Sequence, residues 1–199
     1  RIEPIIDKNI YERSFASYAG NSLSGSNILI VSNLAETLLT VEIAEQLDAE
    51  NCYFKMALNA APDTFEDKLH IALGDMLGPF DHIINVFDFS AYENEDLAVW
   101  GYQILQKECN FLFAHKREAS ICTIIRINTD SSVKVISESC ALVNMLKGLG
   151  PVLANHKIIC NGVCSDETVD NKTIMAAAVF MLSKYGKILT GEVIELGGK

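Results

Sequence analysis

The stretch Ile28-Leu-Ile-Val-Ser-Asn-Leu-Ala-Glu-Thr-Leu-Leu39 decides the fold of this chain. Its opening apolar run is typical of a strand buried on both faces, and the residues that follow Ser32 are expected to enter a helix. The turn between them contains no glycine, although a phosphate-binding turn needs glycine for tightness and close backbone approach. Glu36 is expected in the first helical turn, where a carboxylate favours the helix dipole but repels a phosphate. This turn is therefore predicted to fold and not to hold a nucleotide.

Short strand patterns alternate with helical patterns along the rest of the chain. A helix is expected near residues 65–76, where Phe65, Leu69 and Ala72 follow helical spacing. Asp170 is expected to cap the last helix and Gly186 to end it. Because strands joined by helices form right-handed crossovers, the class is α/β with a mostly parallel sheet. The strands are predicted at 28–32, 52–58, 81–87, 120–128, 157–163 and 190–196.

Composition narrows the possible functions. The chain has 199 residues, of which 49% are apolar, and a net charge of −10. Without a basic face, neither nucleic acid nor an anionic membrane is expected as a partner. No apolar run is long enough to cross a bilayer, and the beginning of the sequence has no signal-peptide pattern, so we expect a cytoplasmic protein.

The cysteines and histidines are too scattered to indicate a metal or catalytic site. Six cysteines lie mostly among apolar neighbours, as reduced thiols of a cytosolic core do. Cys160 and Cys164 lack a second Cys/His pair at metal-ligand spacing, so no metal is expected. The four isolated histidines are interpreted as surface or structural residues: His70, His82, His115 and His156.

Several segments resemble the short-chain dehydrogenase/reductases, a family of Rossmann-fold oxidoreductases that use NAD(P). The strongest likeness is at the end of the chain, where 174–183 and 189–198 are similar to the family's last helix and strand. Pro79-Phe-Asp-His-Ile-Ile-Asn85 resembles the family's central strand, and Lys157-Ile-Ile-Cys-Asn161 a later one. Asp63-Thr-Phe-Glu-Asp67 resembles the segment after its third strand. The resemblance implies a truncated Rossmann-like, doubly wound parallel sheet of about six strands in a single domain.

The residues that carry the family's chemistry do not match. The three glycines of its T-G-x-x-x-G-x-G turn fall on Asn33, Thr37 and Leu39. Its catalytic tyrosine and lysine fall on Val135 and Ser139, which cannot transfer a proton to a carbonyl. The resemblance therefore implies no bound cofactor and no catalytic residue.

Other polar residues are given structural roles. Asn85 and Asn161 match family asparagines and are expected to hydrogen-bond backbone between strands. The acidic run ending at Asp96 is interpreted as the capped start of a helix.

We divide the chain into an arm or linker at 1–26 and a domain at 27–199 that is a degenerate relative of the family. The leading hypothesis is a non-catalytic subunit, structural or regulatory, that forms a homo- or hetero-oligomer with a homologue of the family. In the family, two long helices form one interface and the last helix and strand form another. Here these correspond to about 94–114, 135–149 and 170–196. The candidate interface residues are Leu142, Leu146, Leu149, Ile174, Ala178, Met181 and Val193.

Two alternatives remain open. One is a working NAD(P)H-dependent reductase of acyl or polyketide-type substrates with an atypical site that uses Thr129 or Tyr92. The other is a module that binds a small ligand or a carrier protein in the cleft at the carboxyl ends of the strands.

Overall fold

The computed structural model describes residues 22–74, 79–89, 96–115, 118–128 and 130–197. Their strands pair in parallel in the order β2-β1-β3-β4-β5-β6. This confirms the α/β class and the six-stranded, Rossmann-like sheet. In chain order the elements are β1 (Asn27–Ser32), α2 (Leu38–Ala49), β2 (Tyr53–Ala57), α3 (Phe65–Gly74), β3 (His82–Asp88), α4 (Leu97–Ala114), β4 (Ala119–Ile127), α5 (Val133–Ala154), β5 (Ile158–Asp166), α6 (Asn171–Leu182), the 3-10 helix η1 (Gly186–Ile188) and β6 (Val193–Leu196).

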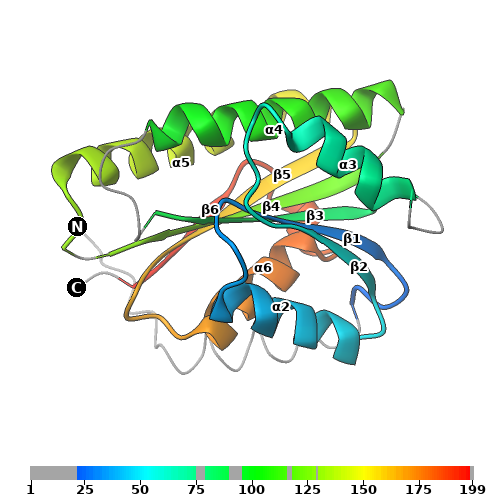
Figure 1. Ribbon diagram of the computed structural model, residues 1–199, viewed down its shortest axis with the longest axis horizontal. Helices are drawn as coiled ribbons and strands as arrows, with labels where there is room; N and C mark the ends of the chain where they lie inside the picture. The colour runs from blue at the N-terminus through cyan, green and yellow to red at the C-terminus, as the bar shows by residue number, and fades with distance from the viewer. Residues whose placement is uncertain (1–21, 75–78, 90–95, 116–117, 129, 198–199) are drawn as a thin grey trace.

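Two layers of helices cover the sheet (Figure 1). Helices α3, α4 and α5 lie on one face, and α2 and α6 lie on the other. One core cluster forms under each layer. All seven residues of β3 are buried, and so are five of the six residues of β1. The two covered faces explain why the strand that starts at Ile28 is apolar without alternation.

The helix ends were only partly predictable. Asp170 caps α6 as expected, because its carboxylate accepts the backbone N–H of Thr173 at 3.0 Å. The expectation that Gly186 ends this helix is wrong, since α6 ends at Leu182 and Gly186 begins η1. A Cβ at Gly186 would lie 2.2 Å from the carbonyl oxygen of Met181. Glycine is required there for close approach of two backbone segments.

The two asparagines differ in role. Asn161 bonds backbone, as expected: its amide donates to the carbonyl of Gly186 at 3.0 Å and accepts the N–H of Glu192 at 3.2 Å. The same expectation is wrong for Asn85. Its amide donates instead to the side chains of Glu108, at 3.0 Å, and Thr123, at 3.3 Å.

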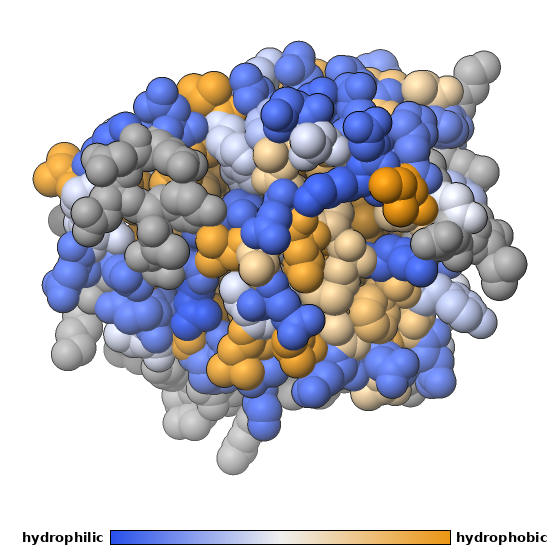
Figure 2. Space-filling model, viewed as in Figure 1, coloured by the Kyte–Doolittle hydropathy of each residue, from blue (hydrophilic) through white to orange (hydrophobic). Residues whose placement is uncertain are grey.

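Strand β2 forms one edge of the sheet. In Figure 2 apolar residues gather near the middle of the view, where Figure 1 places this edge, between more hydrophilic helix surfaces. The strand is short and carries Lys55. The ammonium group of Lys68 donates to the carbonyls of Leu58 and Asn59, just beyond its end. Short length and lysines are the usual protection of an edge strand against pairing with another chain.

Glycine at position 150 is predicted to be essential for seating α5 on the chain before β6. A Cβ at Gly150 would lie 2.2 Å from the Cα of Gly191, which itself has a positive φ of 83°. The variant Gly150→Ala should lose about 2 kcal/mol or more of unfolding free energy, because backbone would have to move. Gly148→Ala, on the same helix with open space around its Cβ, should gain up to about 1 kcal/mol from helix propensity. Urea unfolding measures both, and equal effects would contradict this account.

A second prediction concerns Glu108, which α4 buries completely against β3 and β4. Burial raises its pKa to about 8, although the hydrogen bond from Asn85 acts in the opposite direction. Its Oε1 and the Oδ1 of Asn85 have no partner among the described residues. The folded protein therefore holds a proton that the unfolded chain releases at its ordinary pKa of 4.5. This stability is complete below that pKa and is lost as the pH rises toward the folded pKa.

We expect the free energy of unfolding to fall between pH 6.5 and 8 by roughly 1 to 2 kcal/mol through this carboxyl group. Glu108→Gln cannot ionise and should remove that part of the slope. The difference between variant and wild type, measured by urea unfolding across this range, cancels the titration of other groups. Parallel pH profiles for the two proteins would contradict the buried-proton assignment.

Candidate functional site at the carboxyl edge of the sheet

The natural place for a ligand is the crevice where the chain changes direction between β1 and β3. Strand β1 is followed by the helix of one layer and β3 by a helix of the other, so this is the topological switch point. Here the amide of Asn33 donates to the carbonyl of Asp88 at 2.9 Å and accepts the N–H of the same residue at 3.0 Å. The two reciprocal bonds join the ends of the two strands. Both side chains are buried.

The start of α2 borders the same crevice and bonds to itself. Thr37 is the N-cap residue, and Thr40 lies in the first turn. The N–H of Thr37 donates to the hydroxyl of Thr40 at 2.8 Å, and the N–H of Thr40 donates to the hydroxyl of Thr37 at 3.2 Å. The expectation that Glu36 lies in the first turn is wrong, because it precedes the cap and is exposed. Threonine capping replaces the acidic residue that the sequence suggested for the helix dipole.

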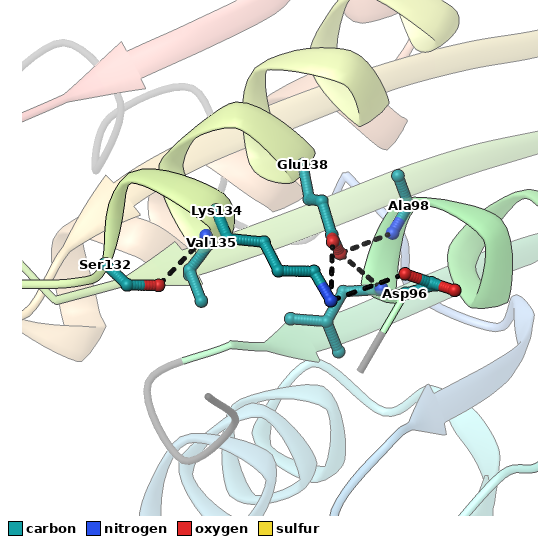
Figure 3. Close-up of polar contacts among 7 residues, drawn as sticks. Asp96, Ala98, Ser132, Lys134, Val135 and Glu138 are labelled. Atoms are coloured by element: carbon teal, nitrogen blue, oxygen red, sulfur yellow. Dashed lines mark hydrogen bonds and ion pairs between the residues drawn. The ribbon is translucent and has the colours of Figure 1, made fainter. Parts of the chain in front are cut away.

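The amino ends of α4 and α5 meet beside this edge (Figure 3). The carboxylate of Glu138 on α5 accepts the N–H groups of Leu97 and Ala98, and so caps α4 from a neighbouring helix. Asp96, the N-cap residue, makes no side-chain cap bond. Lys134 lies between the two acids, 3.4 Å from Asp96 and 3.6 Å from Glu138. The predicted cap from the acidic run is therefore wrong for Asp96, since Glu138 of α5 supplies the cap, and residues 93–95 of that run lie outside the described residues.

The positions that the family resemblance pairs with a tyrosine and a lysine lie on the same helix. Val135 is buried and its N–H donates to Ser132, the N-cap of α5. The hydroxyl of Ser139 is also buried and donates to the carbonyl of Ile136 at 2.8 Å. Neither side chain offers a group that can gain or lose a proton near neutral pH.

The ends of β4 and β5 complete this edge. Arg126 donates to the side chain of Asn171, the first residue of α6, at 3.2 Å. The carboxylate of Asp166 accepts the N–H and the hydroxyl of Thr168. Tyr92 and Thr129, the residues of the alternative reductase site, lie outside the described residues.

Four thiols are buried in the core, Cys164 is half-buried near the carboxyl end of β5, and the histidines other than His82 are exposed. Burial raises the pKa of Cys109 to about 12 and that of Cys122 to about 12. Cys140 is the exposed one among the six free cysteines. Within the described ranges no three His, Cys, Asp or Glu residues are grouped to hold a metal ion, and no helix there is long and apolar enough to span a membrane.

The buried Glu108 was missed by sequence reasoning, whereas His82 was interpreted as a surface or structural residue and is buried. Glu108 has a recognisable signal, because it occupies the apolar stripe of α4 between Ile104 and Leu112. His82 begins β3 and has no comparable pattern.

Most of the candidate interface side chains are covered by this chain itself. Leu142, Leu146, Ile174, Ala178 and Met181 are at most 2% exposed, which corrects their expected position at a surface. They pack in the two core clusters. Of the seven candidates, only Leu149 and Val193 are partly accessible. Any association through these helices must use their exposed neighbours.

Comparison with known proteins finds likeness in structure only. No family model matches this sequence, and no curated protein is significantly similar to it. A short chain dehydrogenase from Leptospira borgpetersenii serovar Hardjo-bovis, solved with bound NAD+, superposes with a TM-score of 0.67 and 11% identity, covering 100% of this chain and 98% of that one. A citronellol catabolism dehydrogenase from Pseudomonas aeruginosa gives a TM-score of 0.68 and 13% identity, covering 88% of this chain and 95% of that one. At these identities the likeness shows the fold alone, and the described chain has the fold of the short-chain dehydrogenases.

Proposed function

We propose that this chain is a non-catalytic subunit with a short-chain dehydrogenase-like fold, which associates through α4 and α5 with a second subunit of the same fold. In this proposal the folded domain expected at 27–199 follows the arm expected at 1–26, although Leu23, in the described part of that arm, is buried in the domain core. The second subunit is another copy of this chain or an active homologue. The observation that carries the proposal is the pair of bonds between Asn33 and Asp88 across the switch-point crevice.

The fold family implies NAD(P), and the residues present do not fit it. A dinucleotide needs close backbone approach and N–H groups directed at its phosphates. At the corresponding turn, Thr37 and Thr40 use two of these N–H groups within the helix itself. Leu39 is buried in the core where the family has its third glycine. We therefore derive no step through a nicotinamide cofactor.

The positions aligned with the proton-transferring pair also support a non-catalytic role. Proton transfer to a carbonyl needs a group with a suitable pKa within reach of the substrate. Val135 has none, and the hydroxyl of Ser139 is bonded to its own helix. Glu138 and Lys134 are engaged in holding α4 and α5 together. Their contacts favour an architectural function for this edge.

The outer faces of α4 and α5 are suited to a protein partner. The exposed positions of α4 carry no charged side chain, in a chain with a net charge of −10. They include Val99, Tyr102 and Phe113. On α5 the exposed charged residues are Lys134 and Lys147, both in ion pairs, and Ile136 is 39% exposed. Depletion of charge and exposed aromatic residues are typical of interface centres.

We expect no saturable binding of NADH or NADPH by the isolated chain at concentrations up to about 1 mM, measured by isothermal titration calorimetry. The reason is the pair of bonds between Asn33 and Asp88 and the self-bonded start of α2. The variant Asn33→Gly/Thr37→Gly opens that region and, even if it binds cofactor, should show no carbonyl reduction, because Val135 and Ser139 remain. Micromolar affinity of the wild type for either cofactor would favour the alternative of a working reductase.

A prediction on association follows from the exposed faces. The wild-type chain should be a dimer or larger in light scattering, and Val99→Glu/Ile136→Glu should give a folded monomer. Burying an unpaired charge costs several kcal/mol, and dissociation avoids this cost. Ile71→Glu is the matched control, since this side chain is 68% exposed on α3. It should leave the assembly unchanged.

Charges at Leu146 or Met181 serve as a second control. Both side chains are buried in the subunit, so these variants should fail to fold, as judged by circular dichroism. A wild-type chain that is a stable monomer, and that has no affinity for an intact homologue from the same source, would overturn the subunit proposal. The small-ligand module would then be the favoured alternative.

A further inference from the structure

A cavity of about 660 Å³ opens at the amino ends of the strands. This is the opposite end of the sheet from the switch-point crevice between β1 and β3. It lies where β3, β4 and β5 begin and where α5 and α6 end. Apolar walls come from Leu23, Ala119, Ile159 and Leu182. This volume is within the range of small-molecule sites, and ten of the fifteen described residues that line the cavity are polar or charged. Neither the fold family's chemistry nor the proposed subunit contact uses this end.

Two unpaired polar side chains line the cavity. His82 and Ser120 are register partners on β3 and β4, so they project from the same face of the sheet. They are 8% and 1% exposed. Within the described structure, His82 Nδ1 and Ser120 Oγ have no hydrogen-bond partner. Leaving a buried donor or acceptor unsatisfied costs about 1 to 3 kcal/mol for each group, so the pair needs an explanation beyond folding.

The imidazole ring of His82 can form hydrogen bonds while it carries no charge. Burial is the main cause that lowers the pKa of His82 to about 4. The ring is neutral at pH 7 and has one donor and one acceptor nitrogen. The imidazole of His82 and the hydroxyl of Ser120 can each donate and accept a hydrogen bond. A hydroxyl group on a ligand has the same two capacities and can therefore bond to both.

The remaining charges lie around the cavity. Lys157 is engaged with Glu118, and the carboxylate of Asp81 accepts the N–H of Asn27. Lys184 and Lys187 have no carboxylate within ion-pair distance in the described structure, and Lys184 lies 5.1 Å from the ring centre of Tyr185. The carbonyl ends of α5 and α6 also face this side, each with about half a negative charge. These negative partial charges repel an anionic ligand and so offset part of the attraction of the two lysines. The balance suits a ligand with one carboxylate better than a doubly charged phosphate.

We propose that this cavity binds a small hydroxylated organic monoacid, with its hydroxyl bonded by Ser120 and His82 and its carboxylate facing Lys184 and Lys187. The apolar walls cover the body of the molecule. A site at the amino ends of the strands is independent of the cofactor crevice and of the α4 and α5 faces.

The probe is 4-hydroxybenzoate, which has a carboxylate, an apolar ring and a hydroxyl, titrated at pH 7 into the wild-type chain. Saturable binding with a dissociation constant of about 1 mM or tighter is expected. Ser120→Ala should weaken it about 2- to 10-fold, the value of one hydrogen bond. The variant should fold, because the hydroxyl has no partner to lose within the described part of the chain. The affinity for benzoate, which lacks the hydroxyl, should not change in this variant.

A second set of variants tests the proposed contact between the ligand carboxylate and the two lysines. Lys184→Gln/Lys187→Gln should weaken binding of both acids by a similar factor and leave 4-cresol binding unchanged. Lys172→Gln is the matched control, since Lys172 is exposed at the other end of α6. It should have no effect. Absence of saturable binding to the wild type, or equal affinities of the wild type, Ser120→Ala and the double lysine variant, would overturn the proposal.

Discussion

The arrangement of side chains at the carboxyl edge of the sheet depends on two hydrogen bonds between the side chain of Asn33 and the backbone of Asp88. They hold the ends of β1 and β3 together where the chain passes from one helix layer to the other. In a parallel sheet this is where the strand ends separate and a ligand can enter. A side chain that satisfies both groups of a neighbouring backbone unit gives the edge a structural function. It also explains why the turn after β1 can use threonine capping in place of glycines.

The architecture was predictable because buried parallel strands and capped helices leave strong patterns. The apolar run from Ile28 reflects a strand that is buried on both faces. The stripe of Phe65, Leu69 and Ala72 reflects a helix that is buried on one face, and all three side chains are buried. Asp170 was recognisable because its cap is local in sequence. Gly186 was misassigned since its requirement comes from Met181 across a turn. The last two residues of the helix expected at 65–76 lie outside the described residues.

Sequence periodicity could not separate the core from an interface. Leu146 and Met181 follow the same helical spacing that an interface stripe would have, yet they face the sheet. A helix that covers one face of a sheet has one apolar stripe for that sheet, and only a second, outward set of apolar residues indicates a partner. On α4 and α5 that second set includes Val99 and Ile136. It is weakly apolar and poor in charge, which a count of hydrophobic residues does not detect.

The polar side chains at the two ends of the sheet differ in how fully they are hydrogen-bonded. At the carboxyl end, amide, guanidinium and carboxylate side chains bond each other or backbone, as Asn33, Arg126 and Glu138 do, although the hydroxyl of Ser165 has no partner among the residues that the structure describes. At the amino end, the Nδ1 of His82 and the hydroxyl of its register partner Ser120 have no hydrogen-bond partner among the described residues. Folding alone favours apolar residues at such positions, since they avoid the cost of unsatisfied groups. Two adjacent polar residues that line one cavity therefore indicate a requirement for hydrogen bonding to something other than the described residues of this chain.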